Sequence, residues 1–197
     1  VYKGRLVDTL SHEMKTPLGV TRAYAEGMQD EADVEKRQAF LQVIQGEAGR
    51  MDRLIVSLLD LSALEAGAVQ LSRERFDFVE LVETVAGRLL LDEPGAEYQL
   101  IHDLPEEKVF IYGDKSRMEQ ALANLIVNAK HHVVRQGVIR LPVGESGGRV
   151  QFSIFNDGAP IPEDELDKIW SKFFRSSSSA KTGGSGLGLA ITAQILK

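Results

Sequence analysis

The residues with the clearest chemical potential occupy positions 11–18, which read Ser-His-Glu-Met-Lys-Thr-Pro-Leu. His12 is the candidate acceptor, because a neutral imidazole is a nucleophile, and the Glu13 carboxylate beside it can hold the ring tautomer and take its proton. On a helix, Thr16 would share the face of His12 one turn later, where its hydroxyl can position a water. Pro17 removes a backbone donor, so we expect the helix to bend just beyond the histidine. A surface histidine on an amphipathic helix would give the same local pattern.

Two asparagines, Asn124 and Asn128, form a second set of candidate residues. They lie four residues apart on a helix predicted over 115–136 and therefore share a face, although Asn is a poor helix former. One interpretation is that their side chains cap or bridge to nearby loops. The other is that they offer oxygen to Mg²⁺ and amide donors to phosphates, because magnesium takes hard oxygen ligands and shares them with a nucleotide.

Three glycines, Gly184, Gly186 and Gly188, precede a predicted helix near the end of the chain. Glycines let the backbone approach a polyphosphate closely, and the start of a helix offers free amide donors. A glycine triplet alone is weak evidence. This one follows no predicted strand, which argues against a Rossmann unit, and it lacks the Gly-Lys-Ser/Thr of a P-loop.

Long amphipathic helices are predicted to carry His12. Apolar residues recur at a three-four spacing over 7–28, and the same spacing recurs over a second helix predicted at 34–66. One pair of such helices would leave much of this apolar surface in water, whereas two copies make a four-helix bundle, so we expect a homodimer. Gly67 is expected to end the second helix, and 68–75 is expected to be a connector.

From Phe76 onward the pattern becomes a mixture of helices and strands. Helices are predicted over 78–91 and 115–136, and strands over 98–103, 109–113, 137–144 and 149–156. The residues between the last two strands, 145–148, predict a hairpin loop. The stretch from Ser176 to Gly184 is too polar and too glycine-rich to pack, so we expect a mobile loop there.

Composition narrows the classes of function. The chain has 197 residues, of which 43% are apolar and 26% charged, a normal balance for two modest globular domains. Its net charge of -6 argues against broad nucleic-acid binding, and the absence of cysteine excludes disulfides and cysteine-based zinc sites. No apolar run approaches the roughly 18 residues that span a bilayer. Because the chain starts without Met and stops inside a predicted helix, we interpret it as a cytoplasmic, C-terminally incomplete fragment of a protein anchored in the membrane upstream.

The octapeptide around His12 closely resembles the H-box of sensor histidine kinases, whose usual form is Ser-His-Glu-Leu-Arg-Thr-Pro-Leu. The resemblance implies that His12 accepts a phosphoryl group and that Glu13 acts as the base. It also implies that Glu13 to Thr16 is the family's Glu-x-x-Thr phosphatase pattern.

Residues 113–129 match the N-box of the same family and the segment leading into it. The match implies that Asn128 ligates the metal and that Asn124 supports the phosphate side. A basic residue usually follows the second Asn by two or three positions, and either Lys130 or His131 can take that phosphate-contacting role here.

Residues 156–163 resemble the adenine-binding box, Asp-x-Gly-x-Gly-Ile. Gly158 keeps the first glycine, whereas Asn156 replaces the Asp and Pro160 replaces the second glycine. An Asn carbonyl can accept a hydrogen bond from adenine as an Asp carboxylate does, but the amide also carries a donor, so nucleotide specificity is open at this position.

Two last segments complete the order of the family's boxes. Residues 169–175 resemble the aromatic F-box, which implies nucleotide contacts from Lys172 and Arg175. Residues 184–191 resemble the final glycine box, with the serine-rich loop as its lid.

The resemblance covers nearly the whole chain and implies an α+β protein. The expected organisation is a dimerising helical hairpin over 1–67, a linker over 68–75, and an α/β sandwich over 76–197 of the Bergerat type that binds ATP and Mg²⁺. The implied reaction is attack of His12 on the γ-phosphate, then transfer to an aspartate of a response-regulator receiver domain, with phosphatase activity toward that regulator. The alternatives are a dimeric ATPase of the gyrase or chaperone type, in which an H-box has no role, and a nonenzymatic nucleotide-binding scaffold.

Overall fold

The computed structural model describes residues 2–91, 97–177 and 184–197. The chain divides into two compact units, residues 1–62 and 63–197. Within the described residues, no helix combines the length and the apolar character needed to cross a bilayer.

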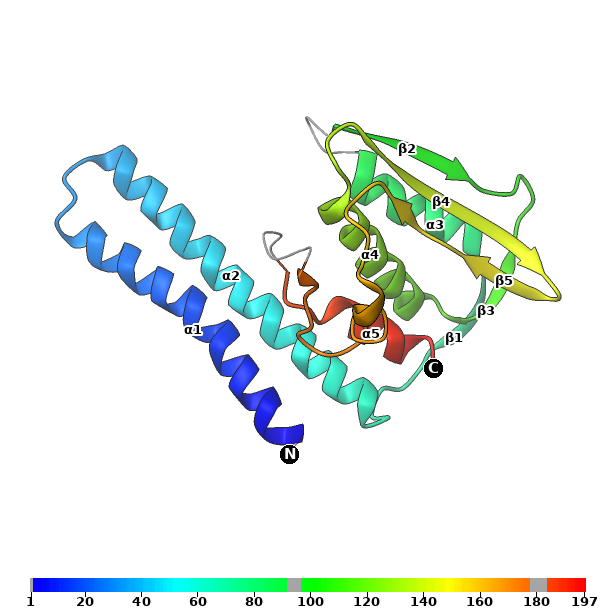
Figure 1. Ribbon diagram of the computed structural model, residues 1–197, viewed down its shortest axis with the longest axis horizontal. Helices are drawn as coiled ribbons and strands as arrows, with labels where there is room; N and C mark the ends of the chain where they lie inside the picture. Colours follow the sequence, from blue (N-terminus) through cyan, green and yellow to red (C-terminus); the bar gives the residue numbers. More distant parts are fainter. Residues whose placement is uncertain (1, 92–96, 178–183) are drawn as a thin grey trace. The chain divides into compact units, whose positions relative to one another are not determined.

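Two long helices form the first unit and run antiparallel to each other (Figure 1). Helix α1 spans Tyr2–Gln29 and continues through Pro17, and α2 spans Val34–Glu65. Helix α2 begins where it does because the Asp33 carboxylate accepts hydrogen bonds from the backbone N–H groups of the first turn, at 2.9 and 3.3 Å. The two predicted helices are therefore confirmed, and α1 starts earlier than the apolar spacing indicated.

Aromatic packing joins the two helices of the hairpin near their connection. The rings of Tyr24 and Phe40 meet edge to face, with centroids 5.2 Å apart, and Gly27 leaves room for the Phe40 ring. Several large apolar side chains nevertheless remain exposed on one hairpin: Leu18, Val34, Leu41, Ile55, Val56 and Leu59. A single hairpin thus leaves much of its apolar surface in water.

Gly67 ends α2 as the sequence predicted. It has a φ of +62°, and its N–H and that of Ala68 donate to the carbonyls of Leu64 and Ala63 at 3.1 and 3.0 Å. This pair of bonds is the Schellman arrangement, which needs a left-handed residue at this position. The connector expected over 68–75 is shorter than predicted, because strand β1, Arg73–Asp77, begins inside it.

Two small sheets build the framework of the second unit. Strand β1 pairs antiparallel with β3, Phe110–Asp114. In the other sheet, β2 runs parallel to β4, which also pairs antiparallel with β5 and β6. Strand β2 spans Tyr98–Asp103 and β4 spans Gly137–Ser146, while β5 spans Arg149–Phe152 and β6 spans Phe155–Asn156.

A proline explains why one predicted strand is two. The register places Pro142 of β4 opposite Ser153, between β5 and β6. Ser153 donates its N–H to the Pro142 carbonyl at 3.0 Å, but proline has no N–H to return. The predicted hairpin loop is confirmed, with Gly147 and Gly148 at φ values of +60° and +73°, as a tight turn between strands requires.

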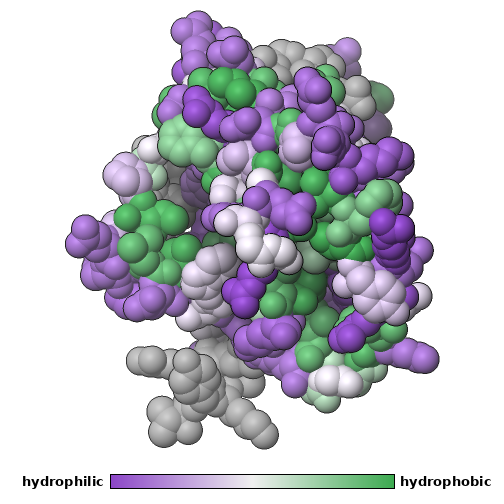
Figure 2. All heavy atoms as spheres, turned by 90° about the vertical axis from the view of Figure 1, so that its right-hand side faces the viewer, coloured by the Kyte–Doolittle hydropathy of each residue, from purple (hydrophilic) through white to green (hydrophobic). Residues whose placement is uncertain are grey.

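Helices α3 and α4 cover one face of the larger sheet (Figure 1). Helix α3 spans Phe78–Ala86 and continues as a π-helical turn, η1, Gly87–Leu91; α4 spans Lys115–His132, η2 is a short 3₁₀ turn at Glu163–Glu165, and α5 spans Gly188–Ile195. Alternate residues of β4 are buried against the helices: Gly137, Ile139, Leu141 and Val143. On the face shown in Figure 2, apolar side chains are interspersed with hydrophilic ones.

The ends of the helices differ from prediction in two places. Helix α4 ends at His132 and not at Gln136, and α5 ends two residues before the end of the chain. Helix α4 begins at Asp114, whose carboxylate accepts the N–H of Arg117 at 3.0 Å and that of Ser72 at 2.9 Å. The hydrogen bond from Arg117, followed by that from Ser72, lowers the pKa of the Asp114 carboxyl, because both favour its charged form.

Candidate functional site

A row of polar side chains on α4 organises the candidate site of the second unit. Asn124, Asn128 and His132 are spaced by four residues and therefore lie on one face, over about 12 Å of helix at 1.5 Å per residue. One end of the row contacts α5 at Gly188, and the other contacts the turn at Gly158. The structure thus brings together three segments that the sequence singled out separately.

Asn124 bridges α4 to the start of α5. Its Nδ2 donates to the Gly188 carbonyl at 3.0 Å and approaches Thr192 Oγ1 at 3.4 Å. The bridging interpretation therefore holds for the amide nitrogen of this residue. The amide oxygen accepts no hydrogen bond from any residue that the structure describes.

Asn128 lies at the middle of the row and is half-buried. Among residues 2–91, 97–177 and 184–197 its side chain makes no hydrogen bond. A half-buried amide with no protein partner costs free energy unless water or a ligand satisfies it. The amide oxygen and the amide nitrogen of Asn128 are thus available to a ligand on the face of α4 that carries the polar row.

The basic residues after Asn128 have different surroundings. Lys130 directs its ammonium to the Leu89 carbonyl, at 3.1 Å, in the π-helical turn η1. His131 is exposed at the end of α4. Desolvation, followed by repulsion from His131, lowers the pKa of the half-buried His132, so its ring stays neutral at neutral pH. Of the two candidates for a phosphate contact, Lys130 is directed at η1, whereas His131 is exposed.

The turn after β6 packs directly onto the end of α4. A Cβ on Gly158 would lie 2.3 Å from the His132 carbonyl oxygen and 2.8 Å from Asn156 Nδ2, so only glycine fits. Asp157 fixes the turn, since its carboxylate accepts the N–H of Val138 at 3.0 Å. Asn156 is half-buried, and although its backbone pairs with β4, its side chain makes no hydrogen bond with the rest of the described chain.

The three glycines near α5 have three different environments. Gly186 has a φ of +67°, and a Cβ there would lie 2.8 Å from backbone atoms of Phe173 and Phe174. Phe173 also donates its N–H to the Gly186 carbonyl at 2.9 Å. A Cβ on Gly188 would make only ordinary van der Waals contact with Asn124, and a Cβ on Gly184 would point into open space. Packing against the F-box backbone, rather than a phosphate, therefore accounts for the absence of a side chain at Gly186.

The F-box segment contributes two basic candidates. Lys172 Nζ lies 2.6 Å from a carboxylate oxygen of Glu65, with both side chains about one-third exposed, at 32% and 34%. Arg175 is half-buried and already takes part in interactions within the chain. Trp170 is 45% exposed, and Phe174, four residues later, is half-buried.

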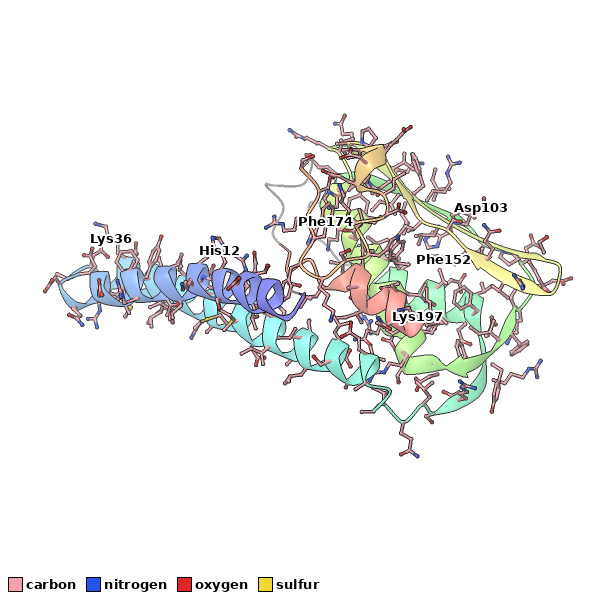
Figure 3. The ribbon with its side chains drawn as sticks, turned by 60° about the horizontal axis from the view of Figure 1, so that its bottom comes forward. His12, Lys36, Asp103, Phe152, Phe174 and Lys197 are labelled. Atoms are coloured by element: carbon pink, nitrogen blue, oxygen red, sulfur yellow. The ribbon has the colours of Figure 1, made fainter. Side chains whose placement is uncertain are left out.

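The first unit presents His12 on the surface of α1 (Figure 3). Glu13 is half-buried beside it, and Pro17 is buried one turn further along. The exposed hydroxyl of Thr16 donates to the His12 carbonyl at a long 3.4 Å. The acceptor candidate is therefore accessible to a second molecule or domain.

Comparisons with known proteins agree with both parts of this arrangement. Residues 2–67 match the family model of the His Kinase A (phospho-acceptor) domain, and residues 113–197 match that of the histidine kinase-, DNA gyrase B- and HSP90-like ATPases. The chain belongs to the sensor histidine kinases. An H-box has no role in an ATPase of the gyrase or chaperone type, so the match to the phospho-acceptor domain argues against that alternative.

Relatives and solved structures extend the match over this kinase chain. Sensor histidine kinase WalK of Bacillus subtilis is 31% identical over 97% of the chain, and the aligned region is 32% of WalK. The chain thus spans about a third of that relative. The Acinetobacter baumannii histidine kinase AdeS superposes with a TM-score of 0.72 at 25% identity, over 94% of this chain and 85% of that one. Histidine kinase ThkA, solved in complex with response regulator protein TrrA, shares the fold with a TM-score of 0.75 at 23% identity, over 87% of this chain and 51% of its own.

Sequence reasoning missed two residues that shape the kinase site. Asp157 was not among the predicted site residues, yet its carboxylate holds the turn against β4. Thr192 was also not predicted, although the sequence contains a signal for it. It is a polar residue four positions after Gly188, in an otherwise apolar stretch of α5. Polar residues in an apolar helix invite a search for a hydrogen-bond partner.

Proposed function

We propose that this chain is the catalytic region of an ATP-dependent protein histidine kinase. It phosphorylates its own His12 from ATP and passes the phosphoryl group to an aspartate of a response regulator. The single observation that carries the nucleotide half of this proposal is the amide of Asn128, which has no partner among the described residues and lies midway between the contacts of α4 with Gly188 and Gly158. The exposed His12 beside Glu13 carries the acceptor half.

The first reaction step makes one bond and breaks one. A neutral ring nitrogen of His12 attacks the γ-phosphorus of ATP, the bond from that phosphorus to the β,γ-bridging oxygen breaks, and ADP leaves. Glu13 takes the proton from the other ring nitrogen and stabilises the phosphorylated imidazole. Positioning of the reacting groups and stabilisation of the phosphate charge supply most of the rate enhancement, since phosphoryl transfer needs little covalent chemistry from the protein.

The residues at the α4 row fit a magnesium–nucleotide complex by the chemistry of their donors. No group of three or more His, Asp or Glu side chains able to hold a metal occurs in the described residues, but two unpaired amide oxygens lie on one helix face. Mg²⁺ prefers such hard oxygens and completes its shell with phosphate and water. We assign the metal to Asn128, the phosphate side to Asn124 and His131, and the base side to Asn156 and Gly158. When bound, the metal neutralises charge on the phosphates.

The basic residues of the F-box have less freedom for this role. Lys172 must leave Glu65 before it can reach a nucleotide, and Lys130 must leave the Leu89 carbonyl. We keep Arg175, Gly184 and Gly188 as proposed nucleotide contacts. The main role of Gly186 is to let the backbone pack closely against Phe173.

The proposed partners follow from the first unit. Large exposed apolar side chains on one hairpin support a homodimer in which two hairpins form a four-helix bundle. The partner in phosphotransfer is a response-regulator receiver domain, as for ThkA, whose structure was solved with the regulator TrrA. We further propose that the full-length protein is anchored in the membrane by a segment outside this chain.

The experiment that tests this function is incubation of the chain with Mg-ATP labelled at the γ-phosphate. We expect a protein-bound phosphate that is labile in acid and stable in base, because a phosphoramidate has those properties and phosphoserine does not. His12→Gln should abolish the label while leaving nucleotide affinity nearly unchanged, since acceptor and nucleotide residues lie in different units. Label of normal amount on His12→Gln would refute the assignment.

A further inference from the structure

Thr192 is the one buried polar side chain among the residues that the structure describes, with 0% of its surface exposed. It lies in α5 between apolar neighbours, where an unbonded hydroxyl would be costly. Its Oγ1 donates to the Gly188 carbonyl at 3.0 Å, one turn earlier in the same helix. The same oxygen lies 3.4 Å from Asn124 Nδ2, as an acceptor.

These bonds select one of the two orientations of the Asn124 amide. With Nδ2 toward α5, its two hydrogens serve the Gly188 carbonyl and Thr192 Oγ1. The flipped amide would place its oxygen against the Gly188 carbonyl, which is also an acceptor. In the flipped state the Thr192 hydroxyl could donate to the amide oxygen only by giving up its own bond to the Gly188 carbonyl, and the Asn124 amide would lose both of its donor bonds.

The consequence is a fixed position for the Asn124 oxygen. Oδ1 lies near the first residue of α5, 3.7 Å from where a Cβ of Gly188 would be. It accepts no hydrogen bond within the described chain, and it is one helical turn from the unpaired amide of Asn128. The Asn124 amide is thus oriented by contacts within the second unit before any ligand binds.

We propose that Thr192 is a positioning residue, which orients the Asn124 amide so that its oxygen faces the magnesium–triphosphate part of the nucleotide. The inference rests on the proposed function, because it deepens the role of Asn124 in that site. Thr192 touches neither nucleotide nor metal and acts only through Asn124.

A purely structural role for Thr192 is the competing explanation. The hydroxyl would then simply tie α5 to α4, and its loss would lower stability without changing how the folded protein binds nucleotide. The two explanations differ in three measurable ways: the affinity for Mg²⁺ with nucleotide, the effect of keeping only the hydroxyl, and the coupling to Asn124.

The test uses Thr192→Val, which keeps the shape and removes the hydroxyl, and Thr192→Ser, which keeps the hydroxyl. The affinity for the β,γ-imido analogue of ATP is measured by calorimetry at several Mg²⁺ concentrations, on the 197-residue chain. The matched control is Thr84→Val, which removes the same kind of hydrogen bond, 2.8 Å to the carbonyl of Glu80, from the exposed side of α3.

Thr192→Val should bind the Mg²⁺–analogue complex about three- to tenfold more weakly, the range expected when one oriented hydrogen-bonding group is lost. Thr192→Ser and Thr84→Val should bind like wild type. In the Asn124→Ala background, Thr192→Val should add no further loss, because its effect passes through that amide.

Equal affinities for Thr192→Val and Thr192→Ser, with a wild type that binds, would overturn the inference and leave the proposed function standing. An undiminished loss in the Asn124→Ala background would also overturn it, since the hydroxyl would then act by another route. A wild-type chain that does not bind the analogue would overturn the proposed function and the inference with it.

Discussion

Replacing Gly186 with alanine should lower the stability of the second unit far more than replacing Gly184 or Gly188 does. Two effects add at this position. A φ of +67° holds the residue in the left-handed region, where a Cβ costs roughly 1–2 kcal/mol. The Cβ would also lie 2.8 Å from backbone atoms of Phe173 and Phe174, and overpacking of this kind costs about 1–3 kcal/mol. We therefore expect a loss of about 2–5 kcal/mol in the free energy of unfolding.

The assay is urea denaturation followed by the fluorescence of Trp170, the single tryptophan of the chain and close in sequence to Phe173. The matched controls are Gly184→Ala, which meets open space, and Gly188→Ala, whose Cβ would make ordinary contact 3.6 Å from Asn124. Both should change stability by less than about 1 kcal/mol, since neither has a positive φ. Three variants of equal stability would refute the close approach of Gly186 to the F-box backbone.

Four further changes test other parts of the site. Asn128→Ala should lose autophosphorylation, with little recovery in excess Mg²⁺, because a metal ligand is removed; a normal rate would refute the metal assignment. Thr16→Ala should spare autophosphorylation yet weaken dephosphorylation of the regulator, because the hydroxyl orients water and does not activate the ring; equal loss of both would indicate a helix defect instead. Asn156→Asp should raise ATP affinity by on the order of 1 kcal/mol and disfavour GTP, because a charged acceptor bonds the adenine amino group more strongly and cannot donate to guanine; an unchanged ATP-to-GTP ratio would exclude this role. Asp114→Ala should cost about 1 kcal/mol by removing the first-turn cap of α4. The lowered pKa of Asp114 contributes stability that is present above its usual value of 3.8 and is lost as the pH falls through the lowered pKa. In acid titrations Asp114→Ala should therefore lose less stability below about pH 4 than the wild type does. Identical acid unfolding of the two proteins would contradict this role of Asp114.

Periodicity and caps predicted most of the elements because these signals are local. The second helix, its end at Gly67, strand β2 and the glycine hairpin all follow from spacing and from residues with special backbone conformations. Strand β1 was missed because Arg73 to Arg75 are charged and exposed, and only pairing with β3 makes them a strand. The early end of α4 has no local signal either, because it is set by distant residues that pack on the His132 carbonyl at Gly158.

The sequence singled out the residues that we propose for the candidate site, but it did not reveal what each of them contacts. Asn124 and Asn128 look alike in sequence, yet the first bridges to α5 and the second has no side-chain partner in the part of the chain that the structure describes, because Thr192 and Gly188 lie beside only the first. Likewise, the three glycines near α5 share a motif, but only the fold reveals that Phe173 occupies the space beside Gly186. Contacts across 64 and 68 residues decide the role of Asn124, and a contact with Phe173, outside the glycine motif itself, decides that of Gly186, so no local pattern encodes them.

The measurement that tests the central claim most directly is the location of the phosphate after the chain has been incubated with Mg-ATP. Tandem mass spectrometry on peptides kept at neutral to alkaline pH preserves phosphohistidine and assigns the modified residue. We predict phosphate on His12 and none on His131 or His132, with no modified peptide from His12→Gln. Phosphate confined to another residue, or a chain that binds Mg-ATP and is never phosphorylated, would contradict the identification of His12 as the acceptor.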